Sequence, residues 1–260
     1  METIDQIDLN HALQVARKTA QAADSVAMEY FRGDLAVETK DDASPVTEAD
    51  RACERIIRDT ILEAFPDHAI YGEEYGQRGE SRYLWLVDPI DGTRSFIRQL
   101  PFWSVQIALM VEDELMLGVS SAPAFGETAW ALKGKGTFLD DRRVQVRATD
   151  ELTHADVSFG NLRTLARGDD WPWVGRIVSQ AARCRGYGDF YSYHRLADGS
   201  QDVVIESDVN ILDIAALTVI VREAGGVMTD LAGQPIGLDT TSVLAASATL
   251  HEQLRAWLDE

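Results

Sequence analysis

Two aspartates three positions apart, Asp88 and Asp91, stand where an apolar segment meets a turn, in the run WLVDPIDGT at 85–93. Hard cations such as Mg²⁺ prefer oxygen ligands, and few carboxylates suffice because water and phosphate oxygens fill the remaining positions. Pro89 constrains the backbone between the two carboxylates, which can leave the carbonyl group of Ile90 free to face a cation. This spacing indicates a divalent-cation site, although acidic turns also occur without one.

A phosphate site is expected immediately after this turn. Gly92 and Thr93 open a predicted helix, and the first N–H groups of a helix have no partner within it. Such N–H groups, together with the positive end of the helix dipole, bind phosphate. The run thus offers carboxylates for a cation next to backbone donors for phosphate oxygens.

Two further acidic positions need an explanation. Glu73 and Glu74 end a predicted strand at 69–72; such a pair usually lies in water, but a divalent ion would relieve the repulsion between the two charges. Asp213 begins a predicted apolar helix at 211–224, where an aspartate is often a helix cap. Its apolar neighbours tolerate a carboxylate only when it has a partner, and a metal ion would be one.

The elements that must position these residues change in character near residue 150. Before it, apolar side chains at helical spacing predict helices over 9–31 and 47–65, with a short extended segment at 35–39 between them. Strands are then predicted at 69–72 and 83–87, followed by a meander-like series at 104–111, 115–121, 128–133, 137–139 and 144–146.

Beyond residue 150, predicted strands and helices alternate. The strands are expected at 157–159, 184–187, 203–205, 227–229 and 243–246, and the helices at 173–182, 189–197, 211–224 and the C-terminus. We therefore predict an α+β half over residues 1–147, which carries most metal ligands. An α/β half over 148–260 follows without a linker and carries Asp213 and the residues that select the substrate.

The composition is that of a globular protein with an acidic surface. The 260 residues are 45% hydrophobic, and 43 Asp and Glu against 24 Lys and Arg give a net charge of −19. This charge repels nucleic acids and anionic membranes, so neither is an expected partner, and it attracts divalent metals and aminated substrates. A soluble acidic surface without further meaning would look the same.

Cysteine and histidine usage excludes other chemistries. Cys53 and Cys184 form neither a CxxC pair nor a disulfide framework, which fits a reducing cytoplasm. The five histidines form no spaced pair, so neither a zinc site nor a histidine nucleophile is expected. No signal peptide and no apolar run of membrane-spanning length is apparent, which also favours a cytoplasmic protein.

Four blocks of sequence, in this order, resemble the inositol-monophosphatase superfamily: KDDASPVTEAD at 40–50, GEE at 72–74, DPIDGT at 88–93, and LDIAAL at 212–217 ahead of EAGG. The last block departs from the W-D-x-A-A-G common in the superfamily, because Leu212 and Leu217 replace Trp and Gly. The resemblance covers nearly the whole chain. It implies a layered αβαβα sandwich and a Mg²⁺-dependent phosphomonoesterase.

The resemblance also implies roles for the acidic residues. Glu73, Asp88 and the carbonyl of Ile90 would hold one Mg²⁺. Asp88, Asp91 and Asp213 would hold a second. The mechanism implied is metal-assisted in-line hydrolysis by water, without a phosphoenzyme, in which Glu73 counts among the catalytic residues through its ion.

Thr93 and Asp50 are the other catalytic residues implied. The backbone of Gly92 and Thr93 would bind the phosphate with the Thr93 hydroxyl, and Asp50 would hydrogen-bond Thr93 and help to take the proton from the attacking water. Alternatively, Asp50 forms a helix capping box with Thr47. Glu74 is expected to contact the residues that bind the metal ions, without binding an ion itself.

Two further features follow from the resemblance. Lys40 and Asp41 fall on a loop that moves over the site in the superfamily, and a weaker third ion is expected near them. A catalytically idle, metal-binding regulatory relative is the rival class, but such a relative would be free to lose ligands, and every expected ligand is present here.

Substrate choice in the superfamily lies mostly in the second half, where Asp189 and Glu206 would surround the leaving group. Two carboxylates suit a cationic alcohol better than a neutral polyol. Asp189 could instead be an ordinary helix N-cap. The run RGYGD at 185–189, with DGTRSF before LPFW, resembles the histidinol-phosphate phosphatase branch; Arg185 is left without a role.

L-histidinol phosphate is therefore the first expected substrate, inositol monophosphate the second, and an adenosine 3′,5′-bisphosphate the third. The superfamily is often dimeric, so a homodimer is expected. Phe102 and Trp103 could belong to its interface or to the core.

Overall fold

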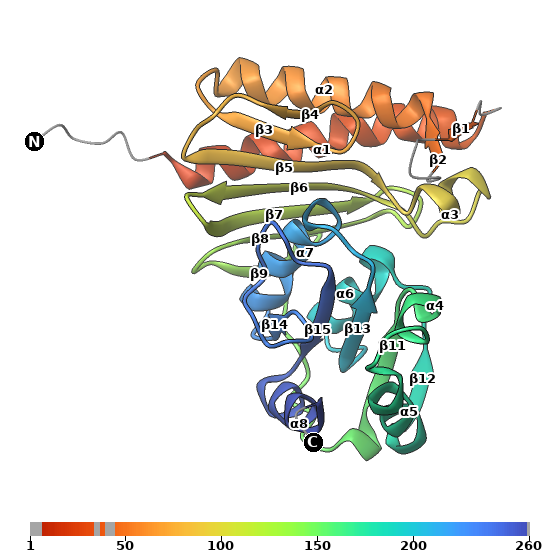
Figure 1. The fold of residues 1–260 in the computed structure, drawn as a ribbon. Coiled ribbons are helices and arrows are strands. Elements are labelled where there is room, and N and C mark those ends of the chain that lie inside the picture. The colour runs from red at the N-terminus through yellow and green to blue at the C-terminus, as the bar shows by residue number, and fades with distance from the viewer. Residues whose placement is uncertain (1–6, 34–36, 40–44, 259–260) are drawn as a thin grey trace, which may run out of the picture.

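The computed structural model describes residues 7–33, 37–39 and 45–258, with the backbone alone for 37–39 and 45–47. Helices and sheets alternate in five layers; in Figure 1 the first helix pair lies at the top, the first sheet below it, and the middle helices, second sheet and outer helices in the lower half. The layered αβαβα sandwich expected from the sequence is confirmed. No helix in the described part of the chain is long and apolar enough to span a membrane.

Helices α1 (Leu9–Phe31) and α2 (Glu48–Ala64) form the first layer and cover one face of the first sheet. Asp8 caps α1 by accepting the N–H groups of Asn10 and His11. Alanines recur along the buried face of α1, and their small side chains let the two helices approach closely. The helix predicted from residue 47 begins at Glu48.

The first sheet has eight strands in the order β10-β9-β8-β7-β6-β5-β3-β4. Their bounds are β3 Ala69–Gly72, β4 Gly76–Arg78, β5 Tyr83–Asp91, β6 Ser104–Val111, β7 Glu114–Ala122, β8 Glu127–Leu132, β9 Gly136–Leu139 and β10 Arg142–Val144. The β3–β5 pair is parallel and the other pairs are antiparallel, as a meander requires. A separate pair, β1 (Val37–Thr39) with β2 (Pro45–Thr47), precedes α2.

Strand β5 is longer than the sequence predicts. We expected a strand ending at Val87, but β5 pairs with β6 up to Asp91, with a register shift between Asp88 and Asp91. Pro89 has no N–H to give to a ladder, so the chain accommodates it in a bulge. The expected turn is therefore an irregularity within a strand.

Helices α6 (Asp189–Ala197) and α7 (Ile211–Glu223) form the middle layer between the two sheets. Helix α7 is buried on nearly every side, which explains why its sequence is apolar all round. One core cluster contains residues of both sheets and of both middle helices. Asp213 lies on the first turn of α7 and thereby reaches the first sheet.

The second sheet has five strands in the order β12-β11-β13-β15-β14, with both parallel and antiparallel pairs. Their bounds are β11 Asp156–Phe159, β12 Arg183–Arg185, β13 Val203–Ser207, β14 Val227–Thr229 and β15 Ser242–Ala246. The outer elements are η1 Leu152–His154, α4 Leu162–Leu165, α5 Trp171–Gln180 and α8 Ala248–Leu258. The boundary predicted at 147/148 falls between β10 and η1.

Candidate active site

Three aspartates from distant parts of the chain meet at one end of the first sheet. Ligand oxygens of Asp88, Asp91 and Asp213 all lie within 4.8 Å of one another. Asp88 and Asp91 come from the bulged end of β5, and Asp213 comes from the first turn of α7. A set of hard oxygen donors this close together can bind a divalent metal ion.

Electrostatics favour a cation at this cluster. Burial raises the pKa of Asp88 well above its ordinary value, and the charges of Glu73 and Asp91 raise the pKa further. The pKa of Asp91 is likewise raised well above its ordinary value, first by burial and then by the charge of Asp189. Burial also raises the pKa of Asp213 to about 6. These carboxylates destabilise one another when ionised, and a divalent cation would remove the repulsion.

Hydrogen bonds orient Asp91 from one side. Its Oδ2 accepts from Oγ of Ser104 at 3.4 Å, from Nε2 of Gln106 at 3.5 Å and from the backbone N–H of Phe190 at 3.2 Å. Among the described residues no hydrogen bond reaches Oδ1 of Asp91. The three donors therefore hold the carboxylate in place while one oxygen stays available to a cation.

Asp213 takes part in a helix cap and also lies in the carboxylate cluster. Asn210 caps α7 by accepting the N–H of Leu212 at 2.7 Å, and Asp213 completes a capping box by accepting the N–H of Asn210 at 2.8 Å. The amide nitrogen of the Asn210 side chain donates to the other carboxylate oxygen of Asp213 at 2.9 Å. The cap fixes the side chain with its oxygens beside Asp88 and Asp91.

Gly92 and Thr93 lie at the start of α3 (Thr93–Ile97), directly after the cluster. Gly92 adopts φ 86°, and a Cβ there would lie 2.6 Å from the carbonyl oxygen of Phe102, so only glycine fits. The Thr93 hydroxyl donates to the carbonyl of Ile90 at 3.1 Å. The carbonyl of Ile90 is therefore not free as we expected, although its second lone pair remains.

The other predicted residues of the first half surround Asp88. Asp50 is buried in the first turn of α2, and its charge acts on Asp88. Glu73 follows β3, and its charge acts on both Asp88 and Asp213. The contact between Asp50 and Thr93 stays a prediction, as does the Thr47 cap. Lys40 and Asp41 lie outside the described residues.

Asp189 and Glu206 lie on the second-half side of the cluster. They line a small pocket of about 40 Å³ together with Asp91, Asn161, Tyr193, Val209, Asp213, Ile214 and Leu217. Burial raises the pKa of Asp189 to about 7 and that of Glu206 to about 8. Four carboxylates thus face one narrow space.

Contacts between α6 and β13 bring Asp189 and Glu206 to the same pocket. The N-cap of α6 is Gly188, so Asp189 is not the ordinary cap considered above; it is the first helical residue, at φ 51°. Glu206 accepts from the hydroxyl of Tyr193 at 2.8 Å, and the backbone N–H of Asp189 partly offsets the rise in the pKa of Glu206. A Cβ on Gly160 would lie 1.8 Å from Glu206 Oε1, so this glycine provides space for the carboxylate.

Several contributors to the site were not found from the sequence. Asn161 and Tyr193 line the pocket but belong to no motif, and Gly160 carries no side chain to notice. Arg185, which we left without a role, is exposed, and its Nη1 donates to the carbonyl of Cys184 at 2.7 Å.

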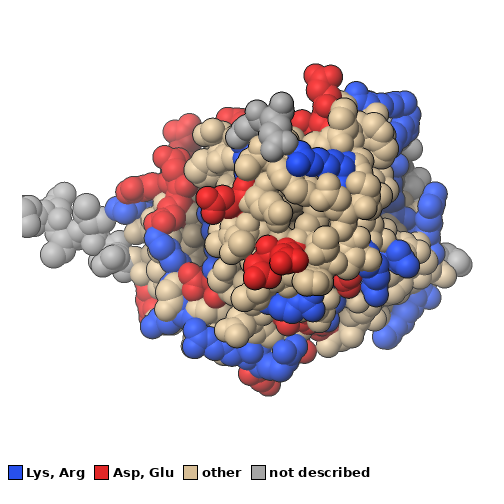
Figure 2. All heavy atoms as spheres, turned by 90° about the horizontal axis from the view of Figure 1, so that it is seen from below, with Lys and Arg blue, Asp and Glu red and all other residues tan. Residues whose placement is uncertain are grey.

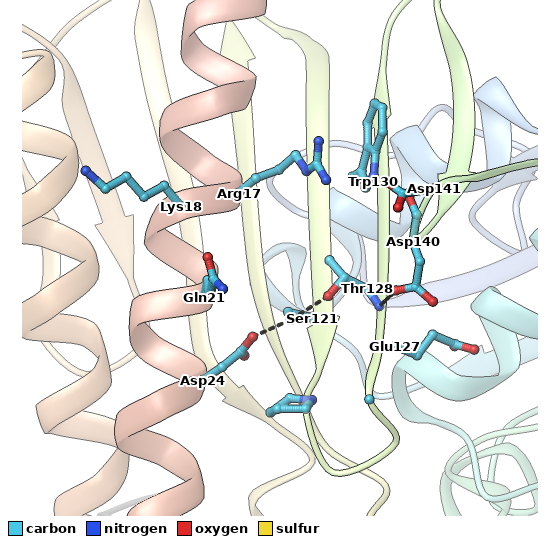
Figure 3. A pocket seen from close by; sticks show the side chains of 12 residues that line it. Arg17, Lys18, Gln21, Asp24, Ser121, Glu127, Thr128, Trp130, Asp140 and Asp141 are labelled. Atoms are coloured by element: carbon cyan, nitrogen blue, oxygen red, sulfur yellow. Dashed lines mark hydrogen bonds between the residues drawn. The ribbon is translucent and has the colours of Figure 1, made fainter.

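A much larger cleft lies elsewhere, between α1 and the β7–β8 hairpin, with a volume of about 640 Å³ (Figure 3). Arg17 lies 4.5 Å above the ring of Trp130, and Asp24 accepts from the hydroxyl of Ser121 at 2.6 Å. Acidic and basic side chains both line it, and none of the clustered carboxylates does. Size alone therefore does not locate the chemistry.

Comparison with known proteins agrees with this geometry. The model described as "Inositol monophosphatase family" matches residues 8–260. Histidinol-phosphatase of Streptomyces coelicolor is 36% identical over 95% of this chain and 97% of that protein. Histidinol-phosphatase of Mycobacterium tuberculosis is 38% identical over 93% of this chain and 95% of that protein.

A solved structure supports the same assignment. Inositol monophosphatase from Anabaena superposes with a TM-score of 0.86 at 27% identity, covering 97% of each chain. The chain therefore belongs to the inositol monophosphatase family. It is a phosphatase, a phosphoric monoester hydrolase.

Proposed function

We propose that the enzyme hydrolyses L-histidinol phosphate to L-histidinol and phosphate with the help of Mg²⁺. The observation that carries this proposal is the pocket in which Asp189 and Glu206 face the aspartate cluster. The leaving alcohol of this substrate carries an ammonium group and an imidazole, and buried carboxylates suit such groups. The histidinol-phosphatases of Streptomyces coelicolor and Mycobacterium tuberculosis, similar over most of the chain, support the same substrate.

Two Mg²⁺ ions are proposed, with a third, weaker one near Lys40 and Asp41. Glu73, Asp88 and the Ile90 carbonyl would hold the first. Asp88, Asp91 and Asp213 would hold the second, where their oxygens already converge. Bound there, the ions would supply a lower pKa for the attacking water and charge stabilisation for the leaving oxygen.

The chain's own groups would position the reactants. The N–H groups of Gly92 and Thr93 would bind phosphate oxygens at the start of α3. The Thr93 hydroxyl, held against the Ile90 carbonyl, would orient the attacking water, and Asp50 would help to accept its proton. Asp189 and Glu206 would pair with the cationic alcohol.

A homodimer is proposed through an aromatic cluster of Phe102, Phe125, Tyr187 and Tyr191, two of which are exposed and two partly buried. The rings of Phe102 and Tyr187 stack at 4.1 Å, yet Tyr187 is 65% exposed and Phe125 is 40% exposed. Trp103 is fully buried and belongs to the core. A Tyr187→Ser variant should shift the light-scattering mass toward a monomer, and a monomeric wild-type protein would contradict the proposal.

The enzyme is proposed to act in the cytoplasm, because both cysteines are free thiols. Neither nucleic acid nor a membrane is proposed as a partner, given the net charge of −19. Figure 2 shows both acidic and basic side chains on one face of the molecule.

The direct test is phosphate release from L-histidinol phosphate, with Mg²⁺ and after EDTA treatment. We expect turnover with Mg²⁺ that EDTA abolishes and added Mg²⁺ restores. Undiminished turnover in EDTA would remove the metal assignment. Failure to turn over this ester, while p-nitrophenyl phosphate is hydrolysed, would remove only the substrate.

A further inference from the structure

A buried ion pair on α2 contacts the turn that presents Glu73. Glu54 is fully buried, and its two carboxylate oxygens accept backbone N–H groups of this turn. Oε2 accepts from Glu74 at 2.6 Å, and Oε1 accepts from Tyr75 at 3.2 Å. The two residues that directly follow Glu73 are therefore tied to α2.

Arg58, one helical turn further along α2, completes the contact. Its Nη1 lies 2.8 Å from Oε1 of Glu54. Its Nη1 and Nη2 donate to the carbonyl of Gly76 at 3.1 and 2.7 Å, and its guanidinium lies 5.8 Å from the ring centre of Tyr75. The Glu54–Arg58 pair thus binds the backbone of three consecutive residues of the turn. It accepts two N–H groups and donates to one carbonyl.

Gly72 makes room for this arrangement from the other side. A Cβ at position 72 would lie 2.2 Å from Oε1 of Glu54, a distance that side-chain carbons do not adopt. Glycine therefore lets the Glu54 carboxylate reach the backbone directly beside Glu73. The buried pair and the glycine together give the turn one defined position.

We propose that Glu54 and Arg58 are positioning residues for the metal site, because they fix the turn from which Glu73 reaches the cation. This inference rests on the proposed metal-binding role of Glu73. Helix α2 also carries Asp50 one turn before Glu54, and the charges of Asp50 and Glu73 both act on Asp88. Groups that orient metal ligands typically change metal affinity by about 10- to 100-fold.

The test replaces Glu54 by glutamine and measures Mg²⁺ and Mn²⁺ binding by calorimetry, without substrate. The glutamine side chain has the size of the glutamate side chain, but its amide nitrogen cannot accept a hydrogen bond. It therefore cannot replace both carboxylate oxygens that accept from Glu74, Tyr75 and Arg58. We expect cation binding to weaken about 10-fold or more, while turnover of p-nitrophenyl phosphate at saturating Mg²⁺ falls only about threefold. Glu63→Gln, an exposed position on the same helix, is the matched control and should change neither.

Arg58→Lys is the second variant, and it tests the positioning role if Glu54→Gln does not fold. Lysine keeps the charge but cannot bridge Glu54 and Gly76 with a planar fork, so we expect a smaller loss of cation affinity in the same direction. Unchanged cation affinity in the folded variants, even with a lower melting temperature, would show that the pair serves stability alone.

Glu73→Gln separates this inference from the function on which it rests. If Glu73→Gln weakens cation binding and the folded Glu54 and Arg58 variants do not, the positioning role is wrong and the metal site stands. If Glu73→Gln leaves cation binding unchanged, Glu73 is not a ligand and both assignments are wrong.

Discussion

The metal cluster and the substrate pocket are both made of buried carboxylates, but they are built in different ways. Asp88 and Asp91 belong to one short run, and a bulge in β5 sets their spacing. Glu206 lies on β13 and accepts from the hydroxyl of Tyr193 on α6, a different element. Local chain geometry therefore sets the spacing of Asp88 and Asp91, whereas contacts between separate elements bring Asp213 to them and hold Glu206 against Tyr193.

The first turn of α6 connects the two regions. The backbone N–H of Asp189 acts to lower the pKa of Glu206, and the next N–H, of Phe190, donates to Asp91 at 3.2 Å. The positive end of this helix therefore stabilises one carboxylate in each region. Variants can still distinguish the metal cluster from the substrate pocket. Loss of a metal ligand should slow the turnover of every substrate, whereas loss of a pocket residue should slow only that of cationic substrates.

The largest effect is expected from Asp91→Asn, which breaks the cluster. An amide is a poor substitute for a metal-binding carboxylate, so turnover of every ester should fall by about three orders of magnitude or more. The fold should survive, and the metal-free variant should melt no lower than wild type because one repelling charge is gone. If Asp91→Asn released phosphate as fast as the wild-type enzyme, the two-metal proposal would be contradicted.

Thr93→Ala should come next, with a loss in kcat of about 10²- to 10⁴-fold. The change removes the hydroxyl that donates to Ile90 but keeps the backbone N–H for phosphate. Cation affinity should therefore change far less than kcat. Thr93→Ser is the control and should keep most activity; a near wild-type kcat for Thr93→Ala would end the catalytic role of Thr93 and of Asp50 with it.

Asp189→Asn should damage only the pocket. We expect kcat/KM for L-histidinol phosphate to fall about 10- to 100-fold, because a charge-assisted hydrogen bond contributes ~1.5–3 kcal/mol. Hydrolysis of p-nitrophenyl phosphate, which offers no cation, should change little. A folding defect would reduce both rates alike, so equal losses would refute the cation pocket.

The smallest effect concerns the pH dependence of the metal-free protein. Burial raises the pKa of Asp213 from 3.8 to about 6, that of Asp189 from 3.8 to about 7, and that of Glu206 from 4.5 to about 8. A raised pKa in the folded state stabilises the fold below the unfolded value, and this stability is lost as the pH rises through the folded value.

The EDTA-treated protein should therefore melt lower at pH 8 than at pH 5.5. A change of about 1 kcal/mol corresponds to a fall of about 2–4 °C for a domain of this size. Saturating Mg²⁺ should reduce the difference, because the cation replaces the protons. A melting temperature that rises between these pH values would show that the carboxylates do not repel one another in the fold.

Residues in the cluster could be predicted because their motif is local. The acidic runs, the helix start at Asp213 and most strands follow from spacing and apolar periodicity. The extension of β5 through Pro89 could not be predicted, because a proline ordinarily ends a strand and only pairing with β6 permits the bulge. Strand β4 was also missed, since Gly76–Arg78 is short and polar.

The pocket and its supports were harder to predict. Asp189 and Glu206 were found through resemblance, but nothing local indicates the positive φ of Asp189 or the bond between Tyr193 and Glu206. Glu54 sits among the charged residues of α2 and differs from them only by its tertiary contacts. Such residues need coordinates, because packing rather than spacing gives them partners.

The most direct test of the central claim is a comparison of substrates by one preparation of the wild-type enzyme. The kcat/KM values for L-histidinol phosphate, inositol 1-phosphate and adenosine 3′,5′-bisphosphate should be measured side by side with saturating Mg²⁺. A pocket built for a cationic alcohol predicts the highest value for L-histidinol phosphate, by about 10-fold or more. A higher value for inositol 1-phosphate would contradict the substrate assignment and leave the phosphatase in place.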